Sequence, residues 1–340
     1  MSWAETNVLD GTSGVSMILP TFRRSEGLHT ALQSLKSQSA GGQFLELIVA
    51  DNDPSGSARI AVANFAARST FPVRYIHVPQ PGVANARNAA LDIAQGRYLA
   101  FLDDDQFARQ NWLEELLGVM EEHGAGLAFC PTHAQSSVEL PFKAECLKFF
   151  TRDIGKTTPG LVDNFFGCGN SLLDRHVCDL PSPPFSRHTN ETGGEDDLLF
   201  SELKDQGIKI VWTDKTSAGE NVEDWRMSHK YIRVRSFAYG QGPSRICLEA
   251  NNFDPKGLLK WSIIGGAQFC VYTPLAVLCR ILGHDSYIKY MRKASEGIGK
   301  VFGYERFRPK IYGAAALKKQ LERENLHKML NQNFALSDLI

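Results

Sequence analysis

GRYLAFLDDDQF (residues 96–107) is an apolar run that ends in three adjacent carboxylates. Its first part, RYLAFLD (97–103), has the length and composition of a buried strand. Neighbouring carboxylates repel one another and raise one another's pKa values, so Asp103, Asp104 and Asp105 need a compensating partner. The residues alone leave three interpretations open: a solvated turn or helix start, an acid/base group, or part of a metal site.

Strands and helices alternate on the N-terminal side of this stretch. Short apolar runs typical of buried strands are each followed by a segment with apolar residues three or four positions apart, which is helical spacing. The expected strands are 15–20, 45–51 and 73–78, and the expected helices are 27–38, 59–68 and 83–94. This alternation predicts an α/β fold with a parallel sheet covered by helices on both faces, whose ligands bind beyond the carboxyl ends of the strands.

The sequence beyond the acids is less regular. Helices are expected at 111–123 and 195–207, and strands at 126–134 and 208–214. The segment 261–282 has a single charge in 22 residues and is long enough to cross a bilayer, although Gln268 and Pro274 argue against spanning. Basic residues follow it and would suit an anionic membrane surface; the alternative is a buried helix of a soluble accessory domain.

The composition bounds the class of protein. With 340 residues, 43% of them hydrophobic and 22% charged, the chain is expected to form one large α/β domain with additions, or two domains. The net charge of −1 provides no basic field for nucleic acid. Its 7 cysteines show no CxxC spacing, and the N-terminal residues lack the pattern of a signal peptide. These features predict a protein with reduced thiols that works on the cytoplasmic side.

Three further polar motifs carry chemistry. GGEDDLL (193–199) places three acids in one turn, more than a helix start needs, so that a general base could lie there beside a metal-bound substrate. ADNDPSG (50–56) either reads a nucleobase or closes an Asx turn. In QPGVANARNAAL (80–91), Arg87 and Asn88 either approach a diphosphate or pack against the acids.

In this order the motifs resemble those of the family 2 glycosyltransferases of the GT-A fold, over about residues 15–220. The segments that carry the resemblance are VSMILPTFRR, LELIVADNDPSG, GVANARNAAL, YLAFLDDDQ and GGEDDLLFSELKDQG. The resemblance implies a Rossmann-like, mostly parallel sheet flanked by helices, followed by a helical, partly apolar C-terminal extension. It also implies an inverting, metal-dependent transfer of a sugar from a nucleotide-sugar donor, and we expect that donor to be UDP-linked.

The resemblance assigns a role to each matching residue. Asp196 matches the acid that deprotonates the acceptor hydroxyl, and Glu195 matches a companion that orients the acceptor or the base. Asp105, with Asp103, is expected to bind Mn²⁺ or Mg²⁺. The residues expected at the nucleotide sugar are Pro20, Thr21, Arg23, Asp51, Asn52, Asp53, Gly82, Arg87, Asn88, Asp103 and Asp104. The acceptor side is expected to include Gly169, Asn170 and Gly194.

The tail resembles one subgroup of this family, near the succinoglycan-type exopolysaccharide glucosyltransferases. The similar residues there include Arg233 and Arg235, which with Arg245 would bind donor or lipid diphosphate; a solvated basic helix is the alternative. Many members carry a histidine after the next strand, whereas this chain has Glu220 and no histidine before His229. The resemblance therefore leaves a third metal ligand undefined.

Together these observations predict a tail at 1–14, a glycosyltransferase domain at 15–225 and a membrane-associated helical region at 226–340. The expected acceptor is a lipid-linked oligosaccharide at the cytoplasmic face of a bacterial inner membrane, in polysaccharide biosynthesis. Two alternatives remain: a degenerate sugar-nucleotide-binding partner in a polysaccharide complex, and a nucleotidyltransferase. The sequence does not define the transferred sugar, the linkage position or the oligomeric state.

Overall fold

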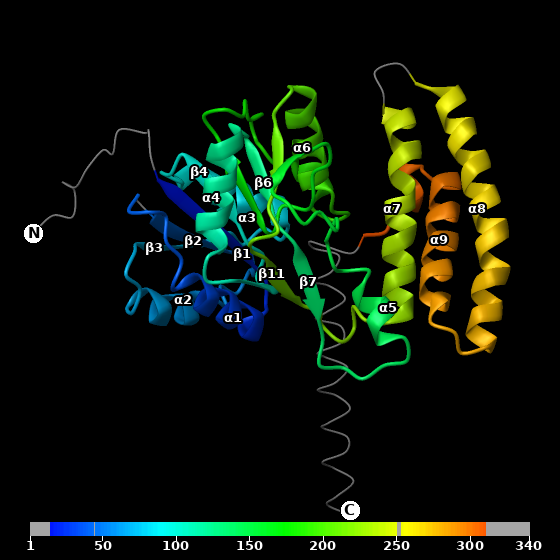
Figure 1. Cartoon of the computed structure of the whole chain (residues 1–340), viewed down its shortest axis with the longest axis horizontal. Coiled ribbons are helices and arrows are strands. Elements are labelled where there is room, and N and C mark those ends of the chain that lie inside the picture. The colour runs from blue at the N-terminus through cyan, green and yellow to red at the C-terminus, as the bar shows by residue number, and fades with distance from the viewer. Residues whose placement is uncertain (1–13, 44, 250–252, 311–340) are drawn as a thin grey trace, which may run out of the picture. The chain divides into compact units, whose positions relative to one another are not determined.

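The computed structural model describes residues 14–43, 45–249 and 253–310 (Figure 1). Its chain forms two compact units. Of the described residues, the first comprises those up to Thr132, Asp153–Gly219 and Lys310, and the second comprises those in His133–Arg152 and Glu220–Pro309. The domain boundary expected at residue 225 stays a prediction.

An eight-stranded sheet forms the centre of the first unit, in the order β3-β2-β1-β4-β9-β6-β10-β8. Its strands are β1 (Val15–Thr21), β2 (Leu45–Asp51), β3 (Val73–His77), β4 (Tyr98–Phe101), β6 (Leu127–Phe129), β8 (Gly160–Val162), β9 (Ser171–Asp174) and β10 (Ile210–Trp212). β1 runs parallel to both β2 and β4, whereas β9 runs antiparallel to β4 and to β6. The expected α/β sheet is therefore confirmed, with an antiparallel strand inserted at its middle.

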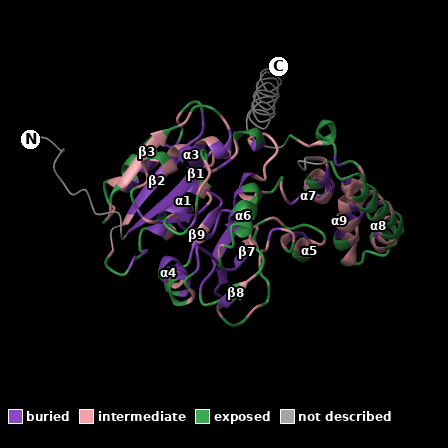
Figure 2. Cartoon of the chain, turned by 90° about the horizontal axis from the view of Figure 1, so that it is seen from above, coloured by how far each residue is buried: buried purple, intermediate pink, exposed green. Residues whose placement is uncertain are grey.

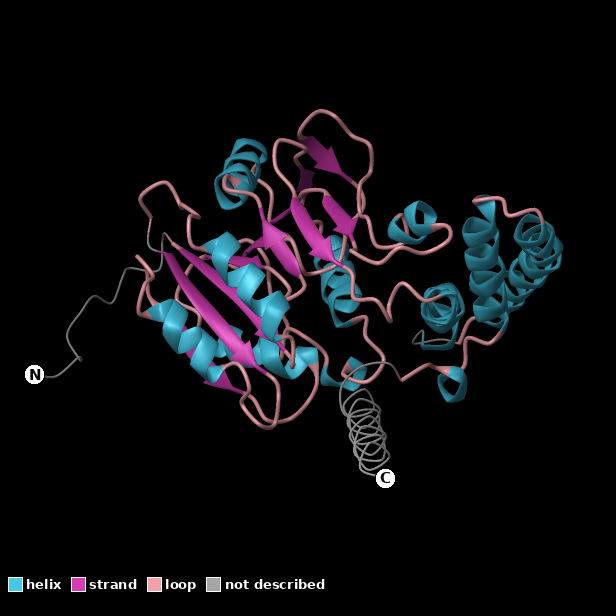
Figure 3. Cartoon of the chain, turned by 90° about the horizontal axis from the view of Figure 1, so that it is seen from below, coloured by secondary structure: helices cyan, strands magenta, loops and turns pink. Residues whose placement is uncertain are grey.

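Helices cover both faces of this sheet (Figure 3). They are α1 (Ser25–Leu35), α2 (Arg59–Ala66), α3 (Val83–Ile93), α4 (Trp112–His123) and α6 (Glu195–Asp205). Met17 and Leu19 of β1 pack in the apolar cluster that contains residues of α1, α2 and α4, and Ile18 packs in the cluster that contains residues of α3 and α6. Successive strand residues thus enter opposite cores, which is why the central strands are buried throughout (Figure 2).

A smaller sheet has the order β5-β11-β7 and is made of β5 (Gln106–Ala108), β11 (Ala218–Asn221) and β7 (Thr132–Gln135). The single strand expected over 126–134 is wrong, because its two ends lie in different sheets as β6 and β7. Pro131 lies between them, and proline cannot donate the ladder hydrogen bond that a continuous central strand requires.

The second unit is helical, with α5 (Lys143–Leu147), α7 (His229–Glu249), α8 (Pro255–Ile281) and α9 (Ser286–Val301). Within it, α9 lies between α7 and α8 (Figure 1). The expected helical, partly apolar C-terminal extension is confirmed. Among the residues that the structure describes, α8 alone is long and apolar enough to cross a membrane.

Candidate functional site

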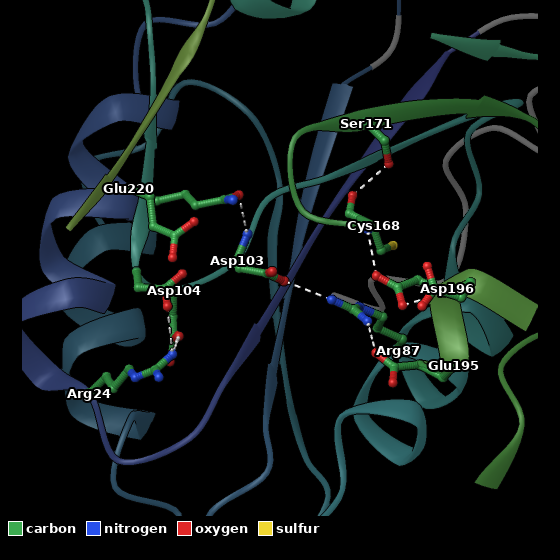
Figure 4. Close-up of polar contacts among 12 residues, drawn as sticks. Arg24, Arg87, Asp103, Asp104, Cys168, Ser171, Glu195, Asp196 and Glu220 are labelled. Atoms are coloured by element: carbon green, nitrogen blue, oxygen red, sulfur yellow. Dashed lines mark hydrogen bonds and ion pairs between the residues drawn. The ribbon is translucent and has the colours of Figure 1, made fainter. Parts of the chain in front are cut away.

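The carboxyl ends of β1 and β4 meet at one edge of the sheet, because the two strands are parallel neighbours. Asp104 Oδ2 accepts hydrogen bonds there from Thr21 Oγ1 at 2.9 Å and from the Phe22 N–H at 3.1 Å. Arg24 Nη1 donates to Asp104 Oδ1 at 2.8 Å and to Asp105 Oδ2 at 3.2 Å (Figure 4). Burial raises the pKa of Asp104, and the Arg24 charge opposes that shift.

Arg24 is thus the compensating partner of two of the three strand-end acids. Sequence reasoning missed it and named Arg23, whose Nε lies 3.8 Å from Asp53 Oδ2 instead. The only signal was the second arginine of PTFRR. Arg23 has a positive φ of 54°, so consecutive arginine side chains leave this turn in different directions.

Asp103 has a different partner from its two neighbours. Arg87 Nη2 lies 2.8 Å from Asp103 Oδ1, and Arg87 Nη1 lies 2.5 Å from Glu195 Oε1 (Figure 4). The Arg87 side chain, on α3, is only 4% exposed, whereas that of Asp103 is 32% exposed. One buried guanidinium therefore joins the strand-end acids to the first residue of α6, although these motifs are far apart in the sequence.

Helix α6 begins after Gly193 and Gly194, whose φ values of 77° and 91° favour glycine. This turn directs Glu195 inward, where it is buried. Burial and the neighbouring Asp196 charge raise the pKa of Glu195 to about 7, against the lowering effect of Arg87. Among the described residues, Glu195 Oε2 has no hydrogen-bond partner.

Asp196 is half-buried, and backbone groups hold both of its oxygens. Oδ2 accepts from the Cys168 N–H at 2.9 Å, and Oδ1 accepts from the Asp197 N–H at 2.9 Å. The contact with Cys168 was not foreseen, although the two residues that follow it, Gly169 and Asn170, were already assigned to the acceptor side. Gly169 lies close to the strand-end acids, since a Cβ added to it would come within 2.4 Å of Asp103 Oδ2. The structure thus brings the acceptor-side segment, the α6 acids and Asp103 together.

The expected base-binding turn is internally bonded. Asn52 Nδ2 donates to the carbonyls of Val78 at 2.9 Å and Gln80 at 2.7 Å, and its Oδ1 accepts from the Gly82 N–H at 2.6 Å. A Cβ added to Gly82, which has a φ of 142°, would lie 2.3 Å from Asn190. The Asn52 side chain therefore stabilises the loop that precedes α3. A contact between Asn52 and a base stays a prediction.

The two acids beside Asn52 also stabilise this turn. Asp51 Oδ2 accepts from the Ala58 N–H at 2.8 Å and from the Tyr75 hydroxyl at 2.9 Å. Asp53 accepts from the N–H and hydroxyl of Ser55. Burial raises the pKa of Asp53, but these hydrogen bonds outweigh it and lower the pKa below 3.8. The Asx turn expected for this segment is therefore formed. Its contact with a nucleobase stays a prediction.

Three other expected site residues have structural partners. Pro20 is buried in β1. Asn88 exchanges two hydrogen bonds with the Phe185 backbone, at 2.7 and 2.9 Å. Asn170 donates to the Cys130 carbonyl at 2.7 Å and accepts from Trp112 Nε1 at 2.7 Å. Their positions near a substrate stay predictions.

The described residues contain no group of three or more His, Cys, Asp or Glu side chains that could hold a metal ion. Asp103 and Asp105 are carboxylates of the kind that Mg²⁺ and Mn²⁺ prefer, but each also faces an arginine. Asp103 remains about one-third exposed. These two carboxylates are therefore suited to a cation whose remaining ligands come from substrate phosphates and water.

Comparison with known proteins gives one family. The model described as Glycosyl transferase family 2 matches residues 16–179. The succinoglycan biosynthesis protein ExoM of Rhizobium meliloti (strain 1021) is 31% identical in an alignment of 266 residues that covers 76% of this chain and 82% of that protein. The Escherichia coli protein WfgD, a UDP-Glc:alpha-D-GlcNAc-diphosphoundecaprenol beta-1,3-glucosyltransferase, is 27% identical over 66% of this chain and 81% of its own length.

One solved structure carries the comparison of folds. The mannosyltransferase PcManGT from Pyrobaculum calidifontis, in complex with GDP-Man and Mn²⁺, superposes with a TM-score of 0.57 at 16% identity. The match covers 85% of this chain and 86% of that one. The expected GT-A fold is thereby confirmed.

Proposed function

The chain belongs to glycosyl transferase family 2, and from that premise we propose that it transfers a sugar, with inversion, from a UDP-linked donor to a lipid-linked or saccharide acceptor in bacterial polysaccharide synthesis. The observation that carries the proposal is the Arg87 bridge, because it places the strand-end acids beside the acids of α6. The names of two relatives support the acceptor: one serves succinoglycan biosynthesis, and the other glucosylates a diphosphoundecaprenol-linked sugar.

On the donor side, we assign Asp104 to the ribose and Asp105, with Asp103, to the metal. Asp104 Oδ1 accepts only from Arg24 among the hydrogen bonds described for it, which leaves a lone pair for a ribose hydroxyl. Both Nδ2 hydrogens of Asn52 are bonded to the 78–82 loop and its Oδ1 already accepts from the Gly82 N–H, so base recognition would rely largely on the backbone groups of this turn.

The residues fit Mn²⁺ or Mg²⁺ held jointly with the donor diphosphate. Asp103 and Asp105 would provide the carboxylate ligands, in exchange for part of their contact with Arg87 and Arg24. When bound, the cation would neutralise charge on the departing diphosphate. The PcManGT complex with GDP-Man and Mn²⁺ supports this assignment by likeness of fold.

On the acceptor side, we assign Asp196 as the general base. Its carboxylate is held by two backbone N–H groups yet is half-exposed, so it can receive the proton of an acceptor hydroxyl. The deprotonated oxygen attacks the sugar on the face opposite the diphosphate, which inverts the anomeric centre. Glu195 acts as a positioning residue, because it is buried and holds Arg87 rather than facing solvent.

The test is an Asp196→Asn variant, with Asp197→Asn as a matched control on the exposed side of the same turn. Removing the base should lower the transfer rate by about 10³-fold while UDP binding, titrated with and without Mn²⁺, stays within about twofold of wild type. The control should transfer sugar at nearly the wild-type rate. Loss of UDP binding together with transfer in Asp196→Asn would contradict the base assignment.

A further inference from the structure

Helix α8 has an exposed apolar face along most of its length. Leu259, Ile263, Val277 and Ile281 are 63%, 63%, 54% and 75% exposed, and Cys270 between them is also exposed. Their spacings of four and seven residues place all five on one side of the helix. The helix carries no Asp or Glu, and its buried residues are Gly265 and Ala276.

The opposite side of α8 packs so closely against α9 that glycines of the two helices face each other. A Cβ added to Gly265 would lie 2.4 Å from the Gly297 carbonyl oxygen. Farther along, Gln268 Nε2 donates to the Lys293 carbonyl at 2.8 Å, and the rings of Tyr272 and Tyr290 stack. The two helices therefore run side by side from about Gly265 to Arg280 of α8 (Figure 1).

This packing bears on whether α8 can span a bilayer. The charged residues of α9 are Lys289, Arg292, Lys293, Glu296 and Lys300. If α8 crossed the hydrocarbon core, α9 would enter it with all five charges, and charged side chains are costly there. Separating the helices instead would break the glycine contact and the hydrogen bond from Lys300 Nζ to Gln268 Oε1, 3.0 Å long.

We propose that α8 lies in the plane of an anionic membrane surface, with its Leu259–Ile281 face at the boundary between headgroups and acyl chains. Lys256, Lys260 and Arg280 lie near the two ends of this face, where anionic headgroups would meet them. Four of the five charges on α9 are also basic. A second copy of the chain is a poorer occupant, since it would bring the same basic residues to the same face.

The depth of three α8 positions distinguishes the two arrangements. Spin labels are attached to the full chain at Cys270, at Leu259→Cys or at Ile281→Cys, with the other exposed or half-buried cysteines, Cys270 and Cys279, replaced by alanine where they are not the labelled site. In vesicles of phosphatidylglycerol and phosphatidylcholine, the in-plane arrangement predicts one shallow depth for all three labels. A spanning helix would place Cys270 near the bilayer centre and the outer labels about 33 Å apart on opposite sides, which would overturn the proposal.

Binding to the same vesicles tests the surface itself. Ile263→Glu should lower partition about tenfold, whereas Ile60→Glu on α2, at a side chain that is 75% exposed, should leave it unchanged. UDP binding by Ile263→Glu in solution should match wild type, so the membrane test stands or fails separately from the sugar chemistry. Equal partition of both variants, equal binding to vesicles of phosphatidylcholine alone, or dimerisation through this face without vesicles would each overturn the proposal.

Discussion

At the scale of single residues, the three strand-end acids do not act as one group. Asp104 and Asp105 face Arg24, whereas Asp103 faces Arg87. The repulsion expected from crowded carboxylates is relieved because two guanidiniums approach them separately. Arg87 also has a second partner, because its other terminal nitrogen pairs with Glu195. Burial favours the neutral form of Glu195, and the charge of Arg87 opposes that effect.

The buried Glu195 predicts a specific dependence of stability on pH. Its pKa rises from 4.5 to about 7 on folding, so between these values the folded chain keeps a proton that the unfolded chain has released. This group's contribution to the free energy of unfolding should therefore fall as pH rises from 4.5 to 7 and then level off. Glu195→Gln should remove that slope, on the order of 1–3 kcal/mol across the window.

Urea unfolding from pH 4.5 to 8.5 measures the slope. Glu114→Gln, at an exposed position in the first turn of α4, changes the same chemical group without burial and should keep the wild-type slope. The assignment would be wrong if Glu195→Gln and wild type changed in parallel with pH.

At the scale of elements, local pattern and tertiary context contributed differently. Helix α3 and strands β1 and β2 follow the patterns of their own residues, since α3 has helical spacing and β1 and β2 are short apolar runs that are buried on both faces. The 126–134 segment did not, because its composition is compatible with one strand while Pro131 interrupts the backbone pairing. Composition also does not distinguish the two sides of α8, because apolar residues lie nearly all round this helix.

Adjacent glycines of α8 provide a test of its packing. Gly265→Leu should destabilise the helical unit by about 1–3 kcal/mol, because its side chain would collide with α9, where even a Cβ would approach the Gly297 oxygen too closely. A Cβ added to Gly266 meets nothing within 4 Å, so Gly266→Leu should change stability far less. Thermal unfolding followed by circular dichroism compares the two, and equal losses would contradict the contact between α8 and α9.

At the scale of the whole molecule, the two units carry different tasks. Every residue of the proposed donor and base sites belongs to the first unit, and the proposed membrane face belongs to the second. UDP with Mn²⁺ should therefore slow amide hydrogen exchange at the ends of β1 and β4 and in the 50–56 and 78–88 segments. Exchange in α7, α8 and α9 should change by less than about twofold.

Exchange followed by mass spectrometry of peptides measures this distribution, with UDP-free buffer containing Mn²⁺ alone as the control. Protection that appeared mainly in α8 and α9 would show that the donor is bound elsewhere than at the strand-end acids.

The sequence by itself determined the alternation of strands and helices, the placement of acids at strand ends, the family resemblance and the apolar character of α8. These follow from patterns among neighbouring residues, which burial on one or two faces imposes directly. Only the tertiary structure decided that Arg24 rather than Arg23 holds Asp104, that Arg87 joins Asp103 to Glu195, and that one side of α8 is occupied by the charged α9. Such partners lie far apart in the chain, and strand order, turn direction and helix packing determine which of them meet.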